Sequence, residues 1–155
     1  MTDFPDVINI KILDFGNGQP VNRIAIIIQL FAKHKNDYYF IPQVSDENGN
    51  IEITQDWLRK ETRLAGEIFI MDYSSSLEDC YPKFKLEIID SRKIKHIVET
   101  MESYKKATPW TQQYIDSIAT ADNYKYMLVS TNYELHGEKK LDIVIKTTTN
   151  REYSL

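Results

Sequence analysis

Two acidic loops contain the side chains of this sequence that are best suited to chemistry. The first loop carries Asp46 and Glu47, and the second carries Glu78 and Asp79. Carboxylates that converge around a pocket can hold a metal ion for hydrolysis, and at least one of them then has a shifted pKa. Carboxylates on an open surface instead form a negative patch that attracts a basic protein. Both a metal-dependent hydrolase and an acidic binding surface are therefore open hypotheses.

The spacing of the first loop does not favour a calcium site. Asp46, Asn48 and Asn50 alternate like the first ligands of a calcium loop, but Gly49 follows Asp46 by three residues instead of five. No Glu stands at the twelfth position of such a loop. We therefore interpret this stretch as a turn, and we expect no metal ion and no other cofactor.

The other nucleophiles and bases lack the neighbours that catalysis requires. Cys80 follows Asp79, and a nearby negative charge raises the pKa of a thiol and makes it less reactive. The three histidines, His34, His96 and His136, are isolated in sequence and show no metal-ligand spacing. We therefore assign no catalytic residue and expect that the protein is not an enzyme.

Tyrosine is abundant, with ten Tyr residues in a chain that is 12% aromatic. A Tyr side chain combines a large apolar face with a hydroxyl group, which suits protein interfaces. Tyr73 and Tyr81 flank the second acidic loop, so they fit a contact surface there. The predicted partner-binding residues are Asp46, Glu47, Tyr73, Glu78, Asp79 and Tyr81.

The composition is that of one ordinary folded domain. The chain has 155 residues, of which 42% are hydrophobic and 27% are charged. Its one cysteine cannot form an internal disulfide, which excludes a disulfide-rich secreted protein and favours a reducing compartment. The first residues lack the positive start and the apolar core of a signal peptide. We expect a cytoplasmic protein with a single domain over residues 1–155.

The net charge of −4 is distributed unevenly along the chain. Residues 1–90 hold 9 basic and 15 acidic side chains, whereas residues 91–155 hold 10 and 8. A negative chain does not attract the phosphates of DNA or RNA. The longest apolar run, residues 24–28, is too short to cross a membrane. We therefore expect neither a nucleic-acid partner nor a membrane, but a protein with a basic surface.

Hydrophobic periodicity predicts strands as far as residue 90. A continuous β-branched run in residues 22–31 predicts a central strand that is covered on both faces. Pro42 places its strand at an edge, and Asn48 with Gly49 predicts a β-hairpin turn. Thr54 caps a short helical turn that ends near residue 63. The predicted strands are residues 7–14, 22–31, 38–44, 51–53, 67–73 and 84–89.

After residue 90 the period changes to that of helices. Apolar side chains from Ile94 to Tyr104 recur every three or four residues and form one stripe of an amphipathic helix. Thr108 and Pro109 then start a second helix, so that residues 91–120 form a two-helix hairpin. Alternation returns in residues 124–135 and 141–149 and predicts a C-terminal β-hairpin.

These elements together predict an α+β fold. We expect an antiparallel β-sandwich-like sheet to which the two-helix hairpin and the C-terminal β-hairpin are added. The β-rich part covers residues 7–90, and the helical hairpin and terminal β-hairpin cover residues 91–150.

Two turns in the first half of the chain resemble those of a known family. Transthyretin-like and carboxypeptidase-regulatory-like β-sandwich domains place a Gly-x-Pro-Val turn before one strand and a Thr/Ser-Asp-x-x-Gly turn before a short Ile/Val strand. The matching residues here are Gly18, Gln19, Pro20 and Val21, and then Ser45, Asp46, Glu47, Asn48 and Gly49. The resemblance covers about residues 7–90 and implies a folding support or a binding module. The branch that hydrolyses hydroxyisourate ends in Tyr-Arg-Gly-Ser, and this chain does not.

The sequence thus favours a non-enzymatic protein-binding module. One concrete form is an acidic inhibitor or immunity protein that binds a basic partner, because such a role needs only steering charge and aromatic anchors. A structural or accessory domain of a larger assembly is the first alternative. A metal-dependent hydrolase that uses the loop carboxylates is the second.

Overall fold

The computed structural model of the chain describes residues 2–33, 38–68, 77–103 and 115–149. Its strands are β1 (Val7–Asp14), β2 (Ala25–Ala32), β3 (Tyr38–Val44), β4 (Asn50–Thr54), β5 (Cys80–Ile88), β6 (Ser130–Glu134) and β7 (Lys140–Thr147). Its helices are α1 (Gln55–Ile68) and α2 (Ser91–Ser103), with short 3₁₀ turns η1 (Leu77–Asp79) and η2 (Asn123–Lys125). Residues 115–119 are also helical. The predicted α+β class is confirmed.

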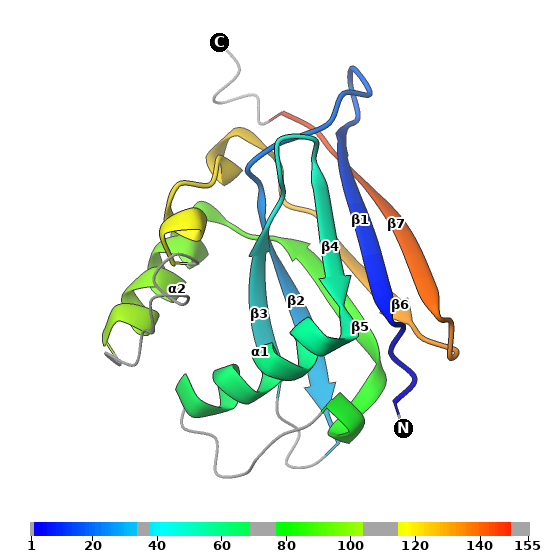
Figure 1. The fold of residues 1–155 in the computed structure, drawn as a ribbon. Coiled ribbons are helices and arrows are strands. Elements are labelled where there is room, and N and C mark those ends of the chain that lie inside the picture. The colour runs from blue at the N-terminus through cyan, green and yellow to red at the C-terminus, as the bar shows by residue number, and fades with distance from the viewer. Residues whose placement is uncertain (1, 34–37, 69–76, 104–114, 150–155) are drawn as a thin grey trace.

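The strands form two sheets, one of three strands in the order β4-β1-β7 and one of four in the order β3-β2-β5-β6 (Figure 1). All neighbours in the four-stranded sheet are antiparallel. In the three-stranded sheet β1 is antiparallel to β4 but parallel to β7. The expectation of a purely antiparallel arrangement is therefore wrong at the β1–β7 pair.

Inward-facing side chains from both sheets belong to one buried core. Alternation in β1 points Ile8, Ile10 and Ile12 toward that core, as the sequence predicts. The other face of β2 is also buried, because Ala25 and Ile27 pack in a second cluster with Ile94 of α2. The prediction of a central strand covered on both faces is thus confirmed.

Helix α1 packs against β3 and β4, the edge strands of the two sheets. Thr54 caps it, because its Oγ1 accepts a hydrogen bond of 3.1 Å from the backbone N of Trp57. The predicted cap is confirmed, but the helix runs to Ile68 instead of ending near residue 63. The strand predicted at residues 67–73 is therefore wrong where it begins, and its residues 69–73 lie outside the described residues.

The turn at Asn48 and Gly49 is present, but the hairpin predicted around it is wrong. β3 pairs with β2 and β4 pairs with β1, so this turn carries the chain from one sheet to the other. Gly49 has a φ of 73°, and its carbonyl accepts a hydrogen bond of 2.8 Å from the N of Ile12. The turn is therefore tied to β1 instead of closing a hairpin.

The predicted C-terminal β-hairpin is also wrong. β6 pairs with β5, whereas β7 pairs with β1 in the other sheet. Alternation assigns one face of each strand to the core but does not choose its neighbour. Ile143 and Ile145 are buried as predicted, yet they complete the sheet of β1.

The helical region after β5 agrees with the prediction where it is described. α2 exists, and Ile115 and Ile118 are buried in the second helical stretch. The connection at residues 104–114 lies outside the described residues, so the two-helix hairpin stays a prediction.

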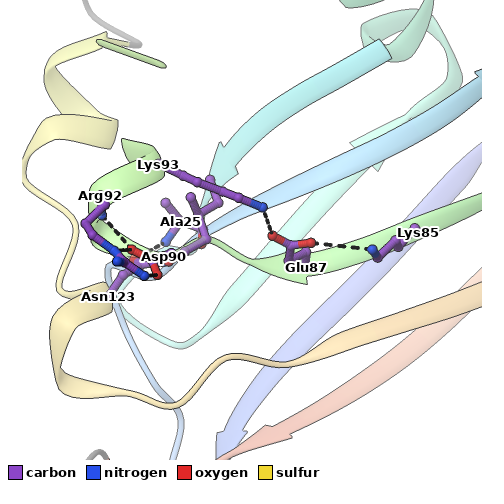
Figure 2. Close-up of polar contacts among 8 residues, drawn as sticks. Ala25, Lys85, Glu87, Asp90, Arg92, Lys93 and Asn123 are labelled. Atoms are coloured by element: carbon purple, nitrogen blue, oxygen red, sulfur yellow. Dashed lines mark hydrogen bonds and ion pairs between the residues drawn. The ribbon is translucent and has the colours of Figure 1, made fainter. Parts of the chain in front are cut away.

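Asn123 anchors this region to the four-stranded sheet, and Asp90 begins α2 beside it (Figure 2). The buried side chain of Asn123 accepts a hydrogen bond of 2.8 Å from the N of Ala25 and donates bonds of 2.7 and 2.6 Å to the carbonyls of Ala25 and Ile89. Asp90 caps α2 through the N of Arg92 at 2.7 Å, and the Arg92 side chain lowers the pKa of Asp90 to about 2. Asn123 thus completes the hydrogen bonding of β2 where β2 begins.

Replacing Asn123 tests this anchor. We expect Asn123→Ala to lower the free energy of unfolding by about 3 kcal/mol, because the N of Ala25 and the carbonyl of Ile89 lose this buried partner, whereas the Ala25 carbonyl keeps its bond of 3.1 Å from the N of Ile89. Urea denaturation followed by circular dichroism measures the change. Asn132→Ala, at an exposed position of β6, is the matched control and should cost less than about 0.5 kcal/mol. A loss below about 1 kcal/mol for Asn123→Ala would contradict the anchoring role.

A comparison of Gly49 with Gly18 distinguishes the effect of close packing from that of backbone strain. A Cβ at Gly49 would lie 2.6 Å from the Ile12 carbonyl oxygen, whereas a Cβ at Gly18 meets nothing within 4 Å. The two φ angles are similar, 73° and 70°. We expect Gly49→Ala to cost about 2 kcal/mol more than Gly18→Ala in the same denaturation assay. Equal losses of stability in the two variants would contradict this prediction, because they would mean that the turn can move away from β1 at no cost.

Candidate functional site

The two acidic loops lie at opposite ends of the four-stranded sheet (Figure 1). Val44, just before the first loop, pairs with Ala25, whereas Cys80, just after the second, pairs with Ala32. The seven residue steps of β2 between these pairs span about 23 Å. The four carboxylates therefore cannot converge around one metal ion, and they do not form one negative patch. The hydrolase hypothesis lacks the geometry that it requires.

In the first loop, one carboxylate supports the turn and the other is free to contact a partner. Oδ1 of Asp46 accepts hydrogen bonds from the backbone N of Asn48 at 2.8 Å and of Asn50 at 2.9 Å. Asp46 thus holds the turn in shape. Glu47 is exposed beside it.

The second loop, at η1, is tied to α1. A carboxylate oxygen of Glu78 lies 2.5 Å from the guanidinium of Arg59, whose other nitrogen donates to the side chain of Gln55. The hydrogen bond from Arg59 lowers the pKa of Glu78. The carbonyl of Asp79 accepts a bond of 2.7 Å from the N of Lys33. This loop therefore joins α1 to the end of β2.

The residues that follow η1 are poor candidates for catalysis. Burial, with the charge of Asp79, raises the pKa of the Cys80 thiol to about 12, so the reactive thiolate is disfavoured. Tyr81 is 43% exposed, and the Nζ of Lys83 lies 5.5 Å from the centre of its ring. Tyr81 is thus available for contact, whereas Tyr73 lies outside the described residues.

No metal centre is evident in the described ranges. Within residues 2–33, 38–68, 77–103 and 115–149, no group of three His, Cys, Asp or Glu side chains is placed to hold a metal ion. A polar cleft of about 280 Å³ lies between the N-terminal segment and the start of α1. Its cations include Arg59, which Glu78 already binds. In the same ranges, no helix is long and apolar enough to span a membrane.

Exposed apolar side chains gather around the C-terminal half of β7. Among the described residues, six large hydrophobic side chains are exposed, and all but Tyr81 lie in this region. We call the group the β7 patch. It consists of Phe15 (68% exposed), Tyr124 (45%), Met127 (54%), Leu128 (60%) and Val144 (58%).

Hydrogen bonds fix two members of the β7 patch, Phe15 and Met127, beside the end of β7. The N of Phe15 donates to the carbonyl of Thr147 at 2.7 Å, and the N of Met127 donates to that of Thr148 at 2.9 Å. The hydroxyl of Thr147 adds a bond of 3.0 Å to the Met127 carbonyl. The end of β7 thus brings together segments more than a hundred residues apart in sequence.

Two lysines line the β7 patch. The Nζ of Lys146 lies 6.0 Å from the centre of the Phe15 ring, and that of Lys125 lies 5.6 Å from the centre of the Tyr124 ring. Lys125 also lies 3.9 Å from the carboxylate of Asp122. Both of these lysines thus lie over aromatic rings of the patch, and Lys125 is also paired with a carboxylate.

Sequence reasoning placed no site at the β7 patch. Residues 124–129 were included in a predicted strand, but β6 begins only at Ser130. Phe15 stands directly before a Gly-rich loop, and Met127 and Leu128 precede the strand as an unbroken apolar pair. The continuous apolar run Met127-Leu128-Val129, which interrupts the alternation of its segment, was the available signal, whereas Val144 alternates normally within β7.

No protein-family model matches the chain, and no curated protein sequence matches it. Among solved structures, it is similar to sea bream transthyretin in complex with thyroxine, at 16% identity and a TM-score of 0.40 over 92% of each chain. It is also similar to a 9R-lipoxygenase from Cyanothece, at 12% identity and a TM-score of 0.38. That match covers 91% of this chain but only 16% of the lipoxygenase. The likeness concerns fold alone.

The Arg59–Glu78 pair gives a testable pH dependence. Because its pKa is lowered in the folded state, Glu78 contributes stability above its ordinary pKa of 4.5 and loses it as the pH falls through the lowered value. We expect Glu78→Gln to cost about 0.5 kcal/mol at neutral pH, since both side chains are partly exposed. Denaturation at several pH values measures this difference, which should vanish in acid. Glu47→Gln, the exposed control, should cost nothing, and an equal loss in both variants would contradict the assignment.

Proposed function

We propose that the protein is a non-enzymatic protein-binding module that contacts its partner through the β7 patch. The observation that carries the proposal is the gathering of Phe15, Tyr124, Met127, Leu128 and Val144, each between 45% and 68% exposed, around one strand end. Monomeric proteins rarely leave a large apolar patch open to water unless it serves an interaction. Side chains of this size contribute about 1.5–3 kcal/mol each when they become fully buried, which is sufficient to anchor a partner.

The partner's chemistry follows from the rim of the patch. The first acidic loop lies at the same end of the molecule, since Gly49 bonds to Ile12 and Phe15 follows three residues later. Exposed Glu47 therefore lies on the side of the patch that β1 borders. Carboxylates at a rim raise the association rate of a basic partner more than its affinity. We therefore propose a partner with an apolar contact surface and with basic residues on the side that meets the first acidic loop, away from Lys125 and Lys146, as an inhibitor or immunity protein would use.

A structural or accessory domain of a larger assembly is the second candidate. β7 is an edge strand of its sheet, and Val144 lies on it. Edge strands offer unpaired backbone groups to another chain. Under this alternative the same surface joins permanent subunits instead of binding a separate regulatory partner.

Substitutions in the patch test the proposal. We expect the double variant Met127→Ser with Leu128→Ser to weaken partner binding at least about tenfold, because each loses buried apolar area worth more than about 1 kcal/mol. The measurement is affinity capture from the native lysate with quantitative mass spectrometry, followed by titration with the purified partner. Tyr81→Ser, an exposed aromatic at the other end of the sheet, is the matched control and should bind normally.

Salt and oligomeric state distinguish the two candidates. A basic partner should dissociate as the salt concentration rises, because screening weakens its attraction to the first acidic loop. Light scattering on the purified protein should show a monomer. A stable homo-oligomer that the double variant disrupts would favour the assembly alternative, and a partner held equally well by the double variant would contradict the patch.

A further inference from the structure

Helix α1 buries a carboxyl group, that of Glu61. Glu61 is only 5% exposed, and within the part of the chain that the structure describes its Oε1 has no hydrogen-bond partner. Buried side-chain oxygens in native proteins almost always have a partner, because an unpaired one loses its hydration without replacement. An exception of this kind requires an explanation.

The position of Glu61 follows from the period of the helix. Leu58 and Thr62 lie three residues before and one residue after Glu61, on the same buried face of α1. Leu58 is part of the main core. Thr62 satisfies its hydroxyl within the helix, by bonds of 2.9 Å to the Leu58 carbonyl and 3.0 Å to the Arg59 carbonyl. Glu61 therefore enters the protein interior beside Leu58, which is apolar, and Thr62, whose hydroxyl is hydrogen-bonded within the helix.

The elements packed against α1 are β3, β4 and η1. From η1 come Glu78, which binds Arg59, and Asp79; from β4 comes Glu52, which is exposed. The described side chains of β3, residues 41–44, carry no titratable group. On α1 itself, Arg59 is engaged by Glu78 and Gln55, and Lys60 is exposed. Burial accordingly raises the pKa of Glu61 from 4.5 to about 7.

We propose that α1 is a proton-controlled latch, which packs against β3 and β4 while Glu61 is protonated and undocks when this buried carboxyl group ionises. Undocking brings Glu61 into water, where its charge is fully solvated. It also exposes Leu58 and the half-buried Trp57, so the ionised form presents apolar surface that the protonated form hides. The Arg59–Glu78 pair joins α1 to η1 outside the core and resists the same movement. This proposal is independent of the β7 patch.

The sign of the effect follows from the two pKa values. The docked state has the higher pKa, so it binds the proton more tightly than the undocked state does. Docking is therefore strongest below the ordinary value of 4.5 and weakens as the pH rises to about 7. Above that value it changes no further. The difference between the two values corresponds to an increase of up to about 300-fold in the undocking equilibrium constant.

Hydrogen exchange of the full chain, followed by mass spectrometry between about pH 5 and pH 8, tests the latch. Over this pH range, protection factors corrected for the intrinsic exchange rate should fall in α1 by about 70-fold in the native protein. They should stay constant with pH in Glu61→Gln, and in Glu61→Met as a second uncharged variant. Asp56→Asn, which removes an exposed carboxylate from the same helix, is the matched control and should retain the native pH dependence.

The amides of β2 distinguish a local movement from global unfolding. They should remain better protected than those of α1 at every pH, because β2 is central and buried on both faces. Equal protection of α1 and β2 at every pH overturns the proposal, since α1 would then open only with the whole domain. A flat profile in the native protein, or an unchanged profile in Glu61→Gln, overturns it as well.

Discussion

The parallel pairing of β1 with β7 is the interaction on which the rest of the structure depends. It runs over eight residue pairs, from Val7 opposite Lys140 to Asp14 opposite Thr147. This pairing brings the last described strand beside the first and completes the three-stranded sheet. It also fixes the end of β7 next to Phe15, so the β7 patch exists only because this long-range pair forms. Contacts so distant in sequence carry a large loop-closure cost, which the buried Ile143 and Ile145 help to offset.

Local patterns were sufficient to locate most elements of this fold but not to arrange them. The bounds of β1, the edge position of the strand with Pro42 and the cap at Thr54 all follow from chemistry within a few residues. The choice of strand neighbours does not. Asn48 and Gly49 favour a tight turn whether the two strands pair with each other or enter different sheets. In this fold the buried hydroxyl of Ser45 accepts a bond of 3.0 Å from the N of Ile24 and donates one of 3.2 Å to the Val21 carbonyl. Ser45 thus ties the start of the turn to the connection between β1 and β2, a contact that no local pattern predicts.

The same limit explains what sequence reasoning found and missed at the candidate site. Asp46, Glu47, Glu78, Asp79 and Tyr81 do lie in or next to exposed or half-exposed loops, as acidic and aromatic loop residues usually do. How far these residues lie from one another depends on which strands pair. The observed pairing places the two acidic loops at opposite ends of the four-stranded sheet. The β7 patch was missed for a different reason. The residue type Leu or Met does not reveal whether the side chain faces water or the core. Only its position relative to the end of a periodic segment helps to distinguish the two cases.

Three carboxyl groups of this chain show how location decides the role of one chemical group. Asp90 at the start of α2 and Glu78 at η1 are charged and bonded to arginines, so Asp90 caps its own helix and Glu78 joins η1 to α1. Glu61 carries the same group into the interior without such a partner among the described residues. The first two strengthen the fold when they ionise, whereas ionisation of Glu61 weakens it. Because α1 begins beside the start of β1, where Thr54 pairs with Val7, and the β7 patch lies beyond the end of β1, the helix can respond to its proton while the patch keeps its shape.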